Sequence, residues 1–171
     1  MGNLFSSPSR SSKQDFLLAC RHNDLQEVQL ILSNGGDVNW RTAEGRGFSG
    51  LHIAANNNSG ELLQLLLVQT GVDVNIRDNL DYTPIMLAFA KGHENIVKRL
   101  CQVTGIHLNS RNGGGCTALH LAVAYNRPGC VSVLREVAGV DWNVRDDDGW
   151  YPVTLAAILG RADCLKIILS P

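Results

Sequence analysis

Apolar residues recur along this chain in short runs with helical spacing, and polar, turn-rich segments separate the runs. In one run Ile85, Ala88 and Phe89 lie at i, i+3 and i+4, which places them on one face of a short helix. A second apolar face begins beyond Gly92 and consists of Ile96, Val97, Leu100 and Cys101. Helices this short are not stable alone in water, so packing on neighbouring segments must supply the stability.

Residues at the expected helix ends support this pattern. Thr83 is a favourable N-cap whose hydroxyl can accept a hydrogen bond from an unpaired amide, and Pro84 suits the first helical position. Gly92 can adopt the left-handed conformation that ends a helix, and Glu94 suits the positive start of the next one. The segment is therefore predicted to form two short helices joined by a tight turn.

The same pattern recurs at an almost constant interval. Similar turns close at four Asn residues spaced 36, 34 and 34 residues apart, namely Asn39, Asn75, Asn109 and Asn143. The helix starts recur as "SGLHIAA", "TPIMLAF", "TALHLAV" and "YPVTLAA", and "FLLAC" from Phe16 begins a divergent first copy. Spacing held this closely over three intervals indicates a repeat array.

The segments "GCTALHLAVAYN", "YTPIMLAFAKGHENIV" and "GELLQLLLVQTGVDVNIRD" resemble ankyrin repeats. They carry the Thr-Pro-Leu-His helix start, the Gly-His between helices and the Asp-Val-Asn before the next hairpin. The resemblance implies an all-α repeat solenoid, with stacked helix-turn-helix units joined by β-hairpin loops. It covers residues 14–171, after a tail of residues 1–13, and implies repeats at about 14–39, 40–75, 76–109, 110–143 and 144–171, the last without a cap.

Several positions depart from the family pattern. The first hairpin, "NWRTAEGRGFSGL", is two residues longer than the others. Asp81 stands where the family usually has the hairpin glycine, so we expect left-handed geometry there. Met86 and Thr154 replace the usual His, and Tyr151 replaces the capping Thr. The helix starts of repeats three and five are therefore expected to be less firmly tied.

Composition and charge argue against several classes of function. A formal net charge of -1 argues against a nucleic-acid binder held by phosphate contacts, and no apolar run has the roughly 18 residues of a membrane span. The five Cys are odd in number and lack a Cys-x-x-Cys pair, which favours a reduced, cytoplasmic protein. The His residues suggest no metal cluster, and no nucleophile has a catalytic context. We expect no cofactor, no metal and no catalysis.

The N-terminal "MGNLFS" matches the N-myristoylation pattern, with Gly2 as the acceptor and Ser6 as the matching hydroxyl residue. The alternative is an ordinary Ser-rich tail. A single myristoyl chain supports only weak, reversible membrane contact, so the modified protein would be at most a peripheral membrane protein.

An arginine stands two residues after each closing Asn and defines an arginine ladder: Arg41, Arg77, Arg111 and Arg145. Guanidinium groups pair with carboxylates at two points, so the ladder could bind an extended acidic partner. The alternative is structural, since the family commonly has a basic residue here and Asp78 and Asp146 follow to offset the charge.

Further candidates lie near the C-terminal end. Trp150 follows Gly149 and is expected to be exposed at a hairpin, with Tyr151 beside it. Family geometry implies a concave surface to which each first helix contributes two residues: Arg21 and His22, Asn56 and Asn57, Ala90 and Lys91, Ala124 and Tyr125, and Ile158 and Leu159. The predicted main contact consists of Arg145, Trp150 and Tyr151, with Tyr125 and Ile158 in the groove. The alternative is that these positions vary freely or await a missing sixth repeat.

These observations predict a protein–protein interaction module or adaptor that acts by binding another protein. Two alternatives remain open. The chain could be the targeting arm of a larger enzyme whose catalytic part lies beyond Pro171, or an adaptor tethered to a membrane through a myristoylated Gly2.

Overall fold

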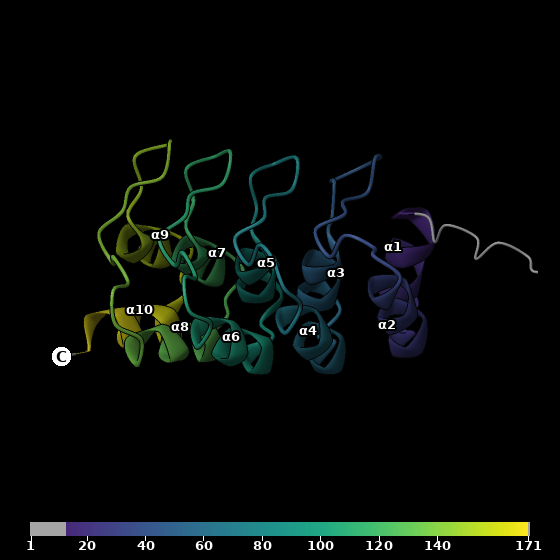
Figure 1. Cartoon of the computed structure of the whole chain (residues 1–171). Coiled ribbons are helices and arrows are strands. Elements are labelled where there is room, and N and C mark those ends of the chain that lie inside the picture. Colours follow the sequence, from purple (N-terminus) through teal and green to yellow (C-terminus); the bar gives the residue numbers. More distant parts are fainter. Residues whose placement is uncertain (1–12, 171) are drawn as a thin grey trace, which may run out of the picture.

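The computed structural model describes residues 13–170, where ten helices form five pairs. The first helices of the pairs are α1 (Lys13–His22), α3 (Gly50–Asn56), α5 (Pro84–Lys91), α7 (Ala118–Ala124) and α9 (Pro152–Ile158). The second helices are α2 (Leu25–Ser33), α4 (Gly60–Leu67), α6 (Glu94–Cys101), α8 (Pro128–Arg135) and α10 (Ala162–Leu169). Figure 1 shows the two sets as parallel rows, with the hairpins projecting together beyond the first-helix row. The predicted all-α solenoid of stacked helix-turn-helix units is confirmed.

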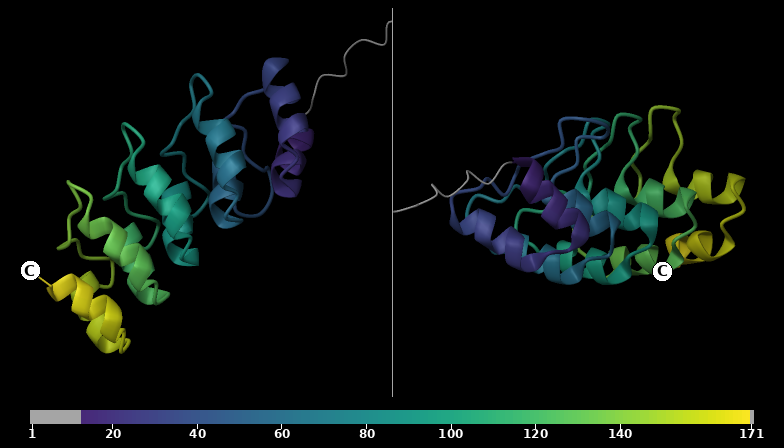
Figure 2. Two further views of the ribbon diagram at one scale, coloured as in Figure 1. Left: turned by 90° about the horizontal axis from the view of Figure 1, so that it is seen from below. Right: turned by 90° about the vertical axis from the view of Figure 1, so that its right-hand side faces the viewer.

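The hairpins and the first-helix row form two walls at an angle to each other. Viewed along the stack, the hairpins stand upright over the helices (Figure 2, right). Where α1 faces the first hairpin, the walls enclose an open groove of about 540 Å³ lined by residues that include Leu17, Leu18, Arg21 and Thr42. We use the name groove for the side of the array that is bounded by the first helices and the hairpins, of which this cavity occupies the N-terminal end.

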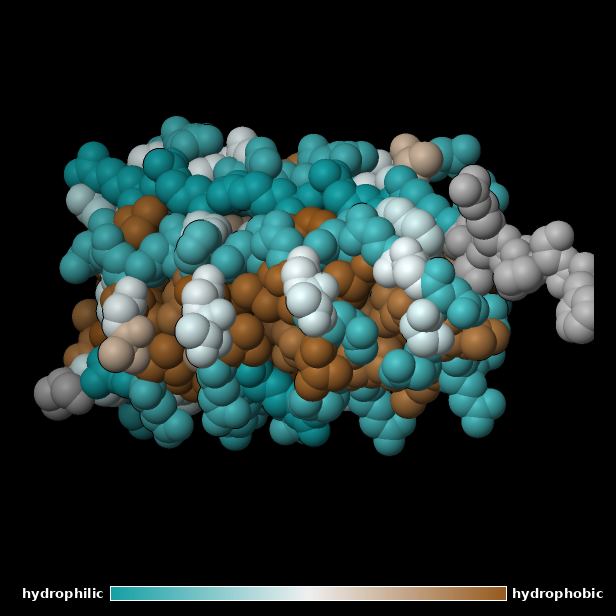
Figure 3. All heavy atoms as spheres, in the orientation of Figure 1, coloured by the Kyte–Doolittle hydropathy of each residue, from teal (hydrophilic) through white to brown (hydrophobic). Residues whose placement is uncertain are grey.

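One apolar core runs through all five pairs. Its largest fully buried side chains come from every pair but the last and include Phe16, Ile31, Leu51, Leu62, Ile85, Phe89, Leu100 and Leu119. On the face shown in Figure 3, a band of hydrophobic side chains separates the polar hairpins from the polar ends of the lower helices. Burial between neighbouring pairs thus supplies the stability that the short helices lack alone.

The predicted helix ends of the third unit are confirmed with one correction. Helix α5 starts at Pro84 after Thr83, and Gly92 ends it with a left-handed φ of 81°. Helix α6 then starts at Glu94, as expected. The predicted capping bond from the Thr83 hydroxyl is wrong, because the Oγ1 atom of Thr83 is buried without a hydrogen-bond partner. Its amide meets only the sulfur of Met86, at 3.5 Å.

The hairpin ends need left-handed backbone at one shared position. Asp81 has a φ of 60° there, as predicted, and the other hairpins place Gly47, Gly115 and Gly149 at this position with positive φ. At Gly115 a second restriction applies, since a Cβ atom would meet the side chains of Arg111 and Asp147. A Cβ atom at Gly115 would therefore displace these two side chains, in addition to the strain of the left-handed backbone.

Asparagine side chains join each unit to the next. The side-chain amide of Asn39 donates to the carbonyl of Gly71 and accepts from the backbone amide of Asp73, both at 2.8 Å. The same two bonds join Asn75 to Gly105 and His107, and Asn109 to Gly139 and Asp141. The Asn residues that mark the repeat in the sequence are therefore its hydrogen-bonded links, which we call the asparagine links.

A second set of links satisfies the C-terminal carbonyls of the first helices. Nε2 of His93 donates to the carbonyl of Asn56 at 3.1 Å. The equivalent Arg127 and Arg161 donate to the carbonyls of Ala90 and Ala124, both at 3.2 Å. Cationic donors are favourable at the negative ends of helices, which explains why arginine can replace the histidine of the motif.

Candidate interaction surface

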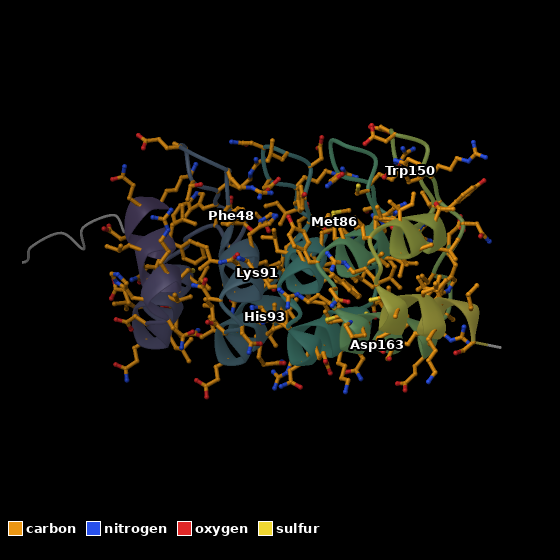
Figure 4. All side chains as sticks on the ribbon, turned by 180° about the vertical axis from the view of Figure 1, so that it is seen from behind. Phe48, Met86, Lys91, His93, Trp150 and Asp163 are labelled. Carbon is orange, nitrogen blue, oxygen red and sulfur yellow. The ribbon has the colours of Figure 1, made fainter. Side chains whose placement is uncertain are left out.

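One residue of each hairpin stands just before the following helix cap. These equivalent residues form what we call the base row: Phe48, Tyr82, Cys116 and Trp150. The first three are partly buried, whereas Trp150 is 43% exposed. Figure 4 shows Phe48 and Trp150 where the hairpins meet the helices, and Lys91 lower on the same view at the end of α5. Three aromatic rings thus recur along one line.

Two buried histidines fix the backbone of this row. Nε2 of His52 lies 2.9 Å from the carbonyl of Tyr82, and Nδ1 accepts from the amide of Ser49. His120 repeats the arrangement, with Nε2 at 3.0 Å from the carbonyl of Trp150. A carbonyl can only accept, so Nε2 carries the proton and the rings are neutral. Burial lowers the pKa of both histidines, which favours this neutral form.

The third unit lacks this link. Met86 occupies the histidine position and is fully buried. A thioether cannot donate to the carbonyl of Cys116, and Thr83 Oγ1 is left unpaired. The expectation that this helix start is less firmly tied is therefore supported by its missing bonds.

The longer first hairpin introduces Arg46 into the groove wall. Its guanidinium lies 4.5 Å from the ring centre of Tyr82 and 5.4 Å from that of Phe48. It also pairs at 2.7 Å with Asp78, whose carboxylate is fully buried. This pairing corrects the expectation that Asp78 offsets the neighbouring Arg77. The length of the hairpin is visible in the sequence, but the partner of Arg46 is not.

Three members of the arginine ladder bridge successive hairpins. Nη2 of Arg41 donates to Oδ1 of Asn79 at 2.6 Å, and Nη2 of Arg111 pairs with Asp147 at the same distance. Nη1 of Arg77 donates to the carbonyl of Arg111 at 2.8 Å. The structural alternative therefore accounts for these three arginines, and partner binding by them stays a prediction.

The fourth arginine is placed differently. The guanidinium of Arg145 stacks over the ring of Tyr151, with 4.7 Å to the ring centre. Tyr151 caps α9 through its backbone, and its amide contacts Thr154 Oγ1 at 2.9 Å. Arg145 and Tyr151 therefore lie beside Trp150 as a connected unit, and their contact with a partner stays a prediction.

The C-terminal half of the groove exposes apolar and aromatic side chains. Tyr125 is 54% exposed, Ile158 60% and Leu159 40%. Burial raises the pKa of the Tyr82 hydroxyl, and the phenol of Tyr125 adds to this shift. The predicted residues Tyr125, Trp150 and Ile158 are thus exposed in the last two units of the array, and their contact with a partner stays a prediction. Exposed large apolar side chains gathered in this way are typical of binding surfaces.

Burial makes three of the cysteine thiols hard to ionise. Burial raises the pKa of Cys20 and Cys130 to about 12 and that of Cys101 to about 11, so these thiols are poor nucleophiles. Between residues 13 and 170, no group of three His, Cys, Asp or Glu side chains could hold a metal. Over the same residues, none of the helices has the length and apolar character to cross a membrane. Gly2 lies outside the described residues.

A model of ankyrin repeats in three copies matches residues 16–112 and 51–146, well over half of the chain. Rabankyrin-5 of Homo sapiens is 35% identical over 78 residues, which cover 43% of this chain and 6% of that protein. Probable E3 ubiquitin-protein ligase XBOS32 of Oryza sativa subsp. japonica is 35% identical over 101 residues, covering 58% and 20%. Putative ankyrin repeat protein FPV031 of Fowlpox virus (strain NVSL) is 31% identical over 97 residues, covering 56% and 28%. The chain thus spans less than a third of these relatives, and its matched residues show that it belongs to the ankyrin repeat family.

Proposed function

We propose that this chain is a protein–protein interaction module that binds its partner along the groove and acts without catalysis of its own. The observation that supports it is the exposure of Tyr125, Trp150 and Ile158 in the last two units of the array. Trp and Tyr supply large rigid contact areas and dominate binding energies at interfaces. On this proposal residues 14–171 act as one binding unit, in a reduced cytoplasmic setting.

Affinity capture from extracts of cells that express the protein tests this proposal. The wild type is compared with a Trp150→Ser, Arg145→Glu variant, whose folding is checked by circular dichroism. A matched control is Leu30→Ser, which removes an exposed leucine on α2, away from the base row. We expect a captured protein that the groove variant loses and the control retains. Identical captures by all three proteins would place the contact elsewhere and overturn the proposal.

A second candidate is that the module serves as the targeting arm of a larger enzyme. The relatives named above favour it, because one is a probable ubiquitin ligase and this chain matches only 20% of that protein. Antibody detection of the native polypeptide tests it by size. A native mass close to the 18.6 kDa of this chain would exclude it, whereas a much larger mass would support it.

A membrane-tethered adaptor is the third candidate and depends on Gly2. Mass spectrometry of the N-terminal peptide from a eukaryotic host decides whether a myristoyl group is attached. An unmodified Gly2 or a retained Met1 would overturn it, while the groove proposal would remain.

A further inference from the structure

The cavity between α1 and the first hairpin, which we call the front cavity, has a volume of about 540 Å³. Leu17 and Leu18 of α1 line one side of it, and Thr42 and Ala43 of the hairpin line the other. The side chain of Leu18 is 51% exposed, although it is large and apolar. The volume lies within the range of small-ligand sites. The front cavity therefore has the space and the apolar wall to accept a few apolar side chains.

Each later hairpin is bonded to the hairpin in front of it. One backbone hydrogen bond joins each neighbouring pair, from the amide of Asn79 to the carbonyl of Arg46 at 2.8 Å, from Gly113 to Leu80 at 3.0 Å and from Asp147 to Gly114 at 3.1 Å. The first hairpin stands over α3, and within the described part of the chain no hairpin stands over α1 (Figure 1). The front cavity thus lies where the row of hairpins would continue by one layer.

The chain that enters α1 arrives at the rim of the front cavity, because Lys13, the first residue of α1, lines it. The nine residues before Lys13, residues 4–12, read "LFSSPSRSS" and lie outside the described residues. We call them the front segment. Nine residues can extend over about 30 Å, whereas Leu18 lies about 7.5 Å from Lys13 along the helix axis. The front segment is therefore attached at the cavity and long enough to fold back into it.

The order of residues in the front segment suits this return. Leu4 and Phe5 are its two large apolar side chains, and both lie at its far end. Between them and α1 stands the Ser7-Pro8 step, a dipeptide that favours the start of a turn. A turn there brings Leu4 and Phe5 back beside residues 10–12, and so toward the exposed Leu18.

Charged residues at the rim indicate how the front segment would be oriented. Lys13 and Arg21 line the cavity from α1, and Glu44 lines it from the hairpin. Among residues 13–170, the carboxylate of Glu44 forms no ion pair. Arg10 can pair with Glu44 on the hairpin side, away from the two cations of α1. An exposed pair contributes little to stability, so this contact would orient the segment while the apolar contacts hold it.

We propose that the front segment folds back into the front cavity, with Leu4 and Phe5 against Leu18 and with Arg10 beside Glu44. There it extends the row of hairpins by one layer and covers the N-terminal end of the groove. A partner that binds at this end has to displace the segment first, so the segment is an autoinhibitory cover. This inference goes beyond the proposed function and does not depend on it.

Brief digestion of the whole, folded chain with trypsin tests the proposal, because docking protects the peptide bond after Arg10. Mass spectrometry follows the release of residues 1–10 from the wild type, from Phe5→Ser, from Leu18→Ser and from the double variant, all checked for folding by circular dichroism. We expect each single variant to be cleaved at least threefold faster than the wild type. The double variant should be cleaved no faster than the single ones, because both changes remove the same contact.

A matched control is Leu30→Ser, which removes an equally exposed leucine from α2 and should leave the cleavage rate unchanged. Nuclear Overhauser effects between the ring protons of Phe5 and the methyl protons of Leu18 provide a second measurement, and we expect to observe them. Equal cleavage rates in all the proteins, additive effects of the two changes, or no such Overhauser effects would overturn the proposal. Protection that increases with protein concentration would also overturn it, because the segment would then dock on a second copy.

Discussion

The second and fourth helix pairs differ from the third in how they hold the next hairpin. In the former, His52 and His120 each connect their own helix start to the backbone of the following base-row residue. In the third pair, Met86 fills the same volume but forms no such bridge. The stack remains continuous through this gap in hydrogen bonding. Apolar burial and the asparagine links therefore hold the layers together there, while the histidine bridges fix the backbone of the base-row residues.

The missing histidine of the third pair also affects stability. Removing one partner of a buried hydrogen bond costs more than replacing both partners with apolar groups. At the third pair only the histidine is replaced, so Thr83 keeps a buried hydroxyl without a partner. This site is consequently a local weakness that the two histidine sites lack.

Replacing His120 with leucine should produce the largest loss of stability. His120→Leu leaves the Thr117 amide and the Trp150 carbonyl without the ring, and we expect a loss of about 2–3 kcal/mol. Met86→Leu conserves volume at a site without the bridge, and should cost less than about 1.5 kcal/mol. Urea unfolding followed by circular dichroism measures both. Equal losses would show that the bridge contributes little beyond packing.

The next largest effect should be a loss of stability in acid that arises at the two histidine-bridged sites. Because burial lowers the pKa of His52 and His120 below the ordinary 6.5, the unfolded chain takes up protons that the folded chain does not as pH falls below about 6.5. The contribution of the two neutral histidines to the free energy of unfolding is therefore fully present above this pH. Below it, this contribution declines as the pH falls toward the folded-state pKa values, by at most about 1.4 kcal/mol per pH unit for each histidine. Asp78, Arg41 and Arg46 lie near His52, and Asp146 and Arg111 near His120.

Urea unfolding at pH 7.5, 6.5 and 5.5 checks this, with the His52→Leu, His120→Leu double variant as the control. The wild type should lose stability more steeply than the variant between pH 6.5 and 5.5. Parallel curves would assign the acid sensitivity to the carboxylates instead.

Removing the hydroxyl groups of the two N-cap residues Thr117 and Thr83 should change the free energy of unfolding by unequal amounts. Thr117→Val removes a hydroxyl that lies 2.9 Å from Nδ1 of His120, and should cost about 1 kcal/mol. Thr83→Val removes a hydroxyl that has no partner, and should leave the free energy of unfolding within about 0.5 kcal/mol of wild type or raise it. A larger loss for Thr83→Val would contradict the assigned difference between the sites.

Restoring the bridge should give the smallest effect, in the opposite direction. Met86→His places a donor toward the Cys116 carbonyl, whose position matches that of the carbonyls of Tyr82 and Trp150, and gives Thr83 a partner. We expect a gain of about 0.5–1 kcal/mol, measured by urea unfolding. A loss would mean that the backbone at Cys116 lies out of reach of a histidine.

The sequence was sufficient to predict the repeat, the helix pairs and the special backbone positions. These depend on local spacing and on residues such as Gly92 and Asp81, whose left-handed geometry follows from their type and place. Exposure of Trp150 was also predicted, from its position just after the hairpin residue Gly149. The features that the sequence predicted are thus those that depend on residues close together along the chain.

The contacts between repeats were not predictable in the same way. The pairing of Arg46 with Asp78 joins residues 32 positions apart, and three arginines of the ladder turn to neighbouring hairpins. The sequence shows that each arginine is present but not where its side chain points. An exposed guanidinium can face solvent, a partner or the next hairpin, and the sequence does not distinguish these. The unpaired hydroxyl of Thr83 likewise depends on Met86, which occupies the position of His52 and His120.

The asparagine links have a consequence for how such a chain can change over generations. Each link reaches the same two backbone groups one unit further on, so its geometry depends on the shared turn and little on the hairpin length or on the surface residues of a unit. Loss or duplication of a whole unit leaves every remaining amide facing a suitable carbonyl, and the link from Asn39 forms although the unit that it spans is two residues longer. The array can therefore be lengthened or shortened in modules while the residues facing the groove are free to diverge.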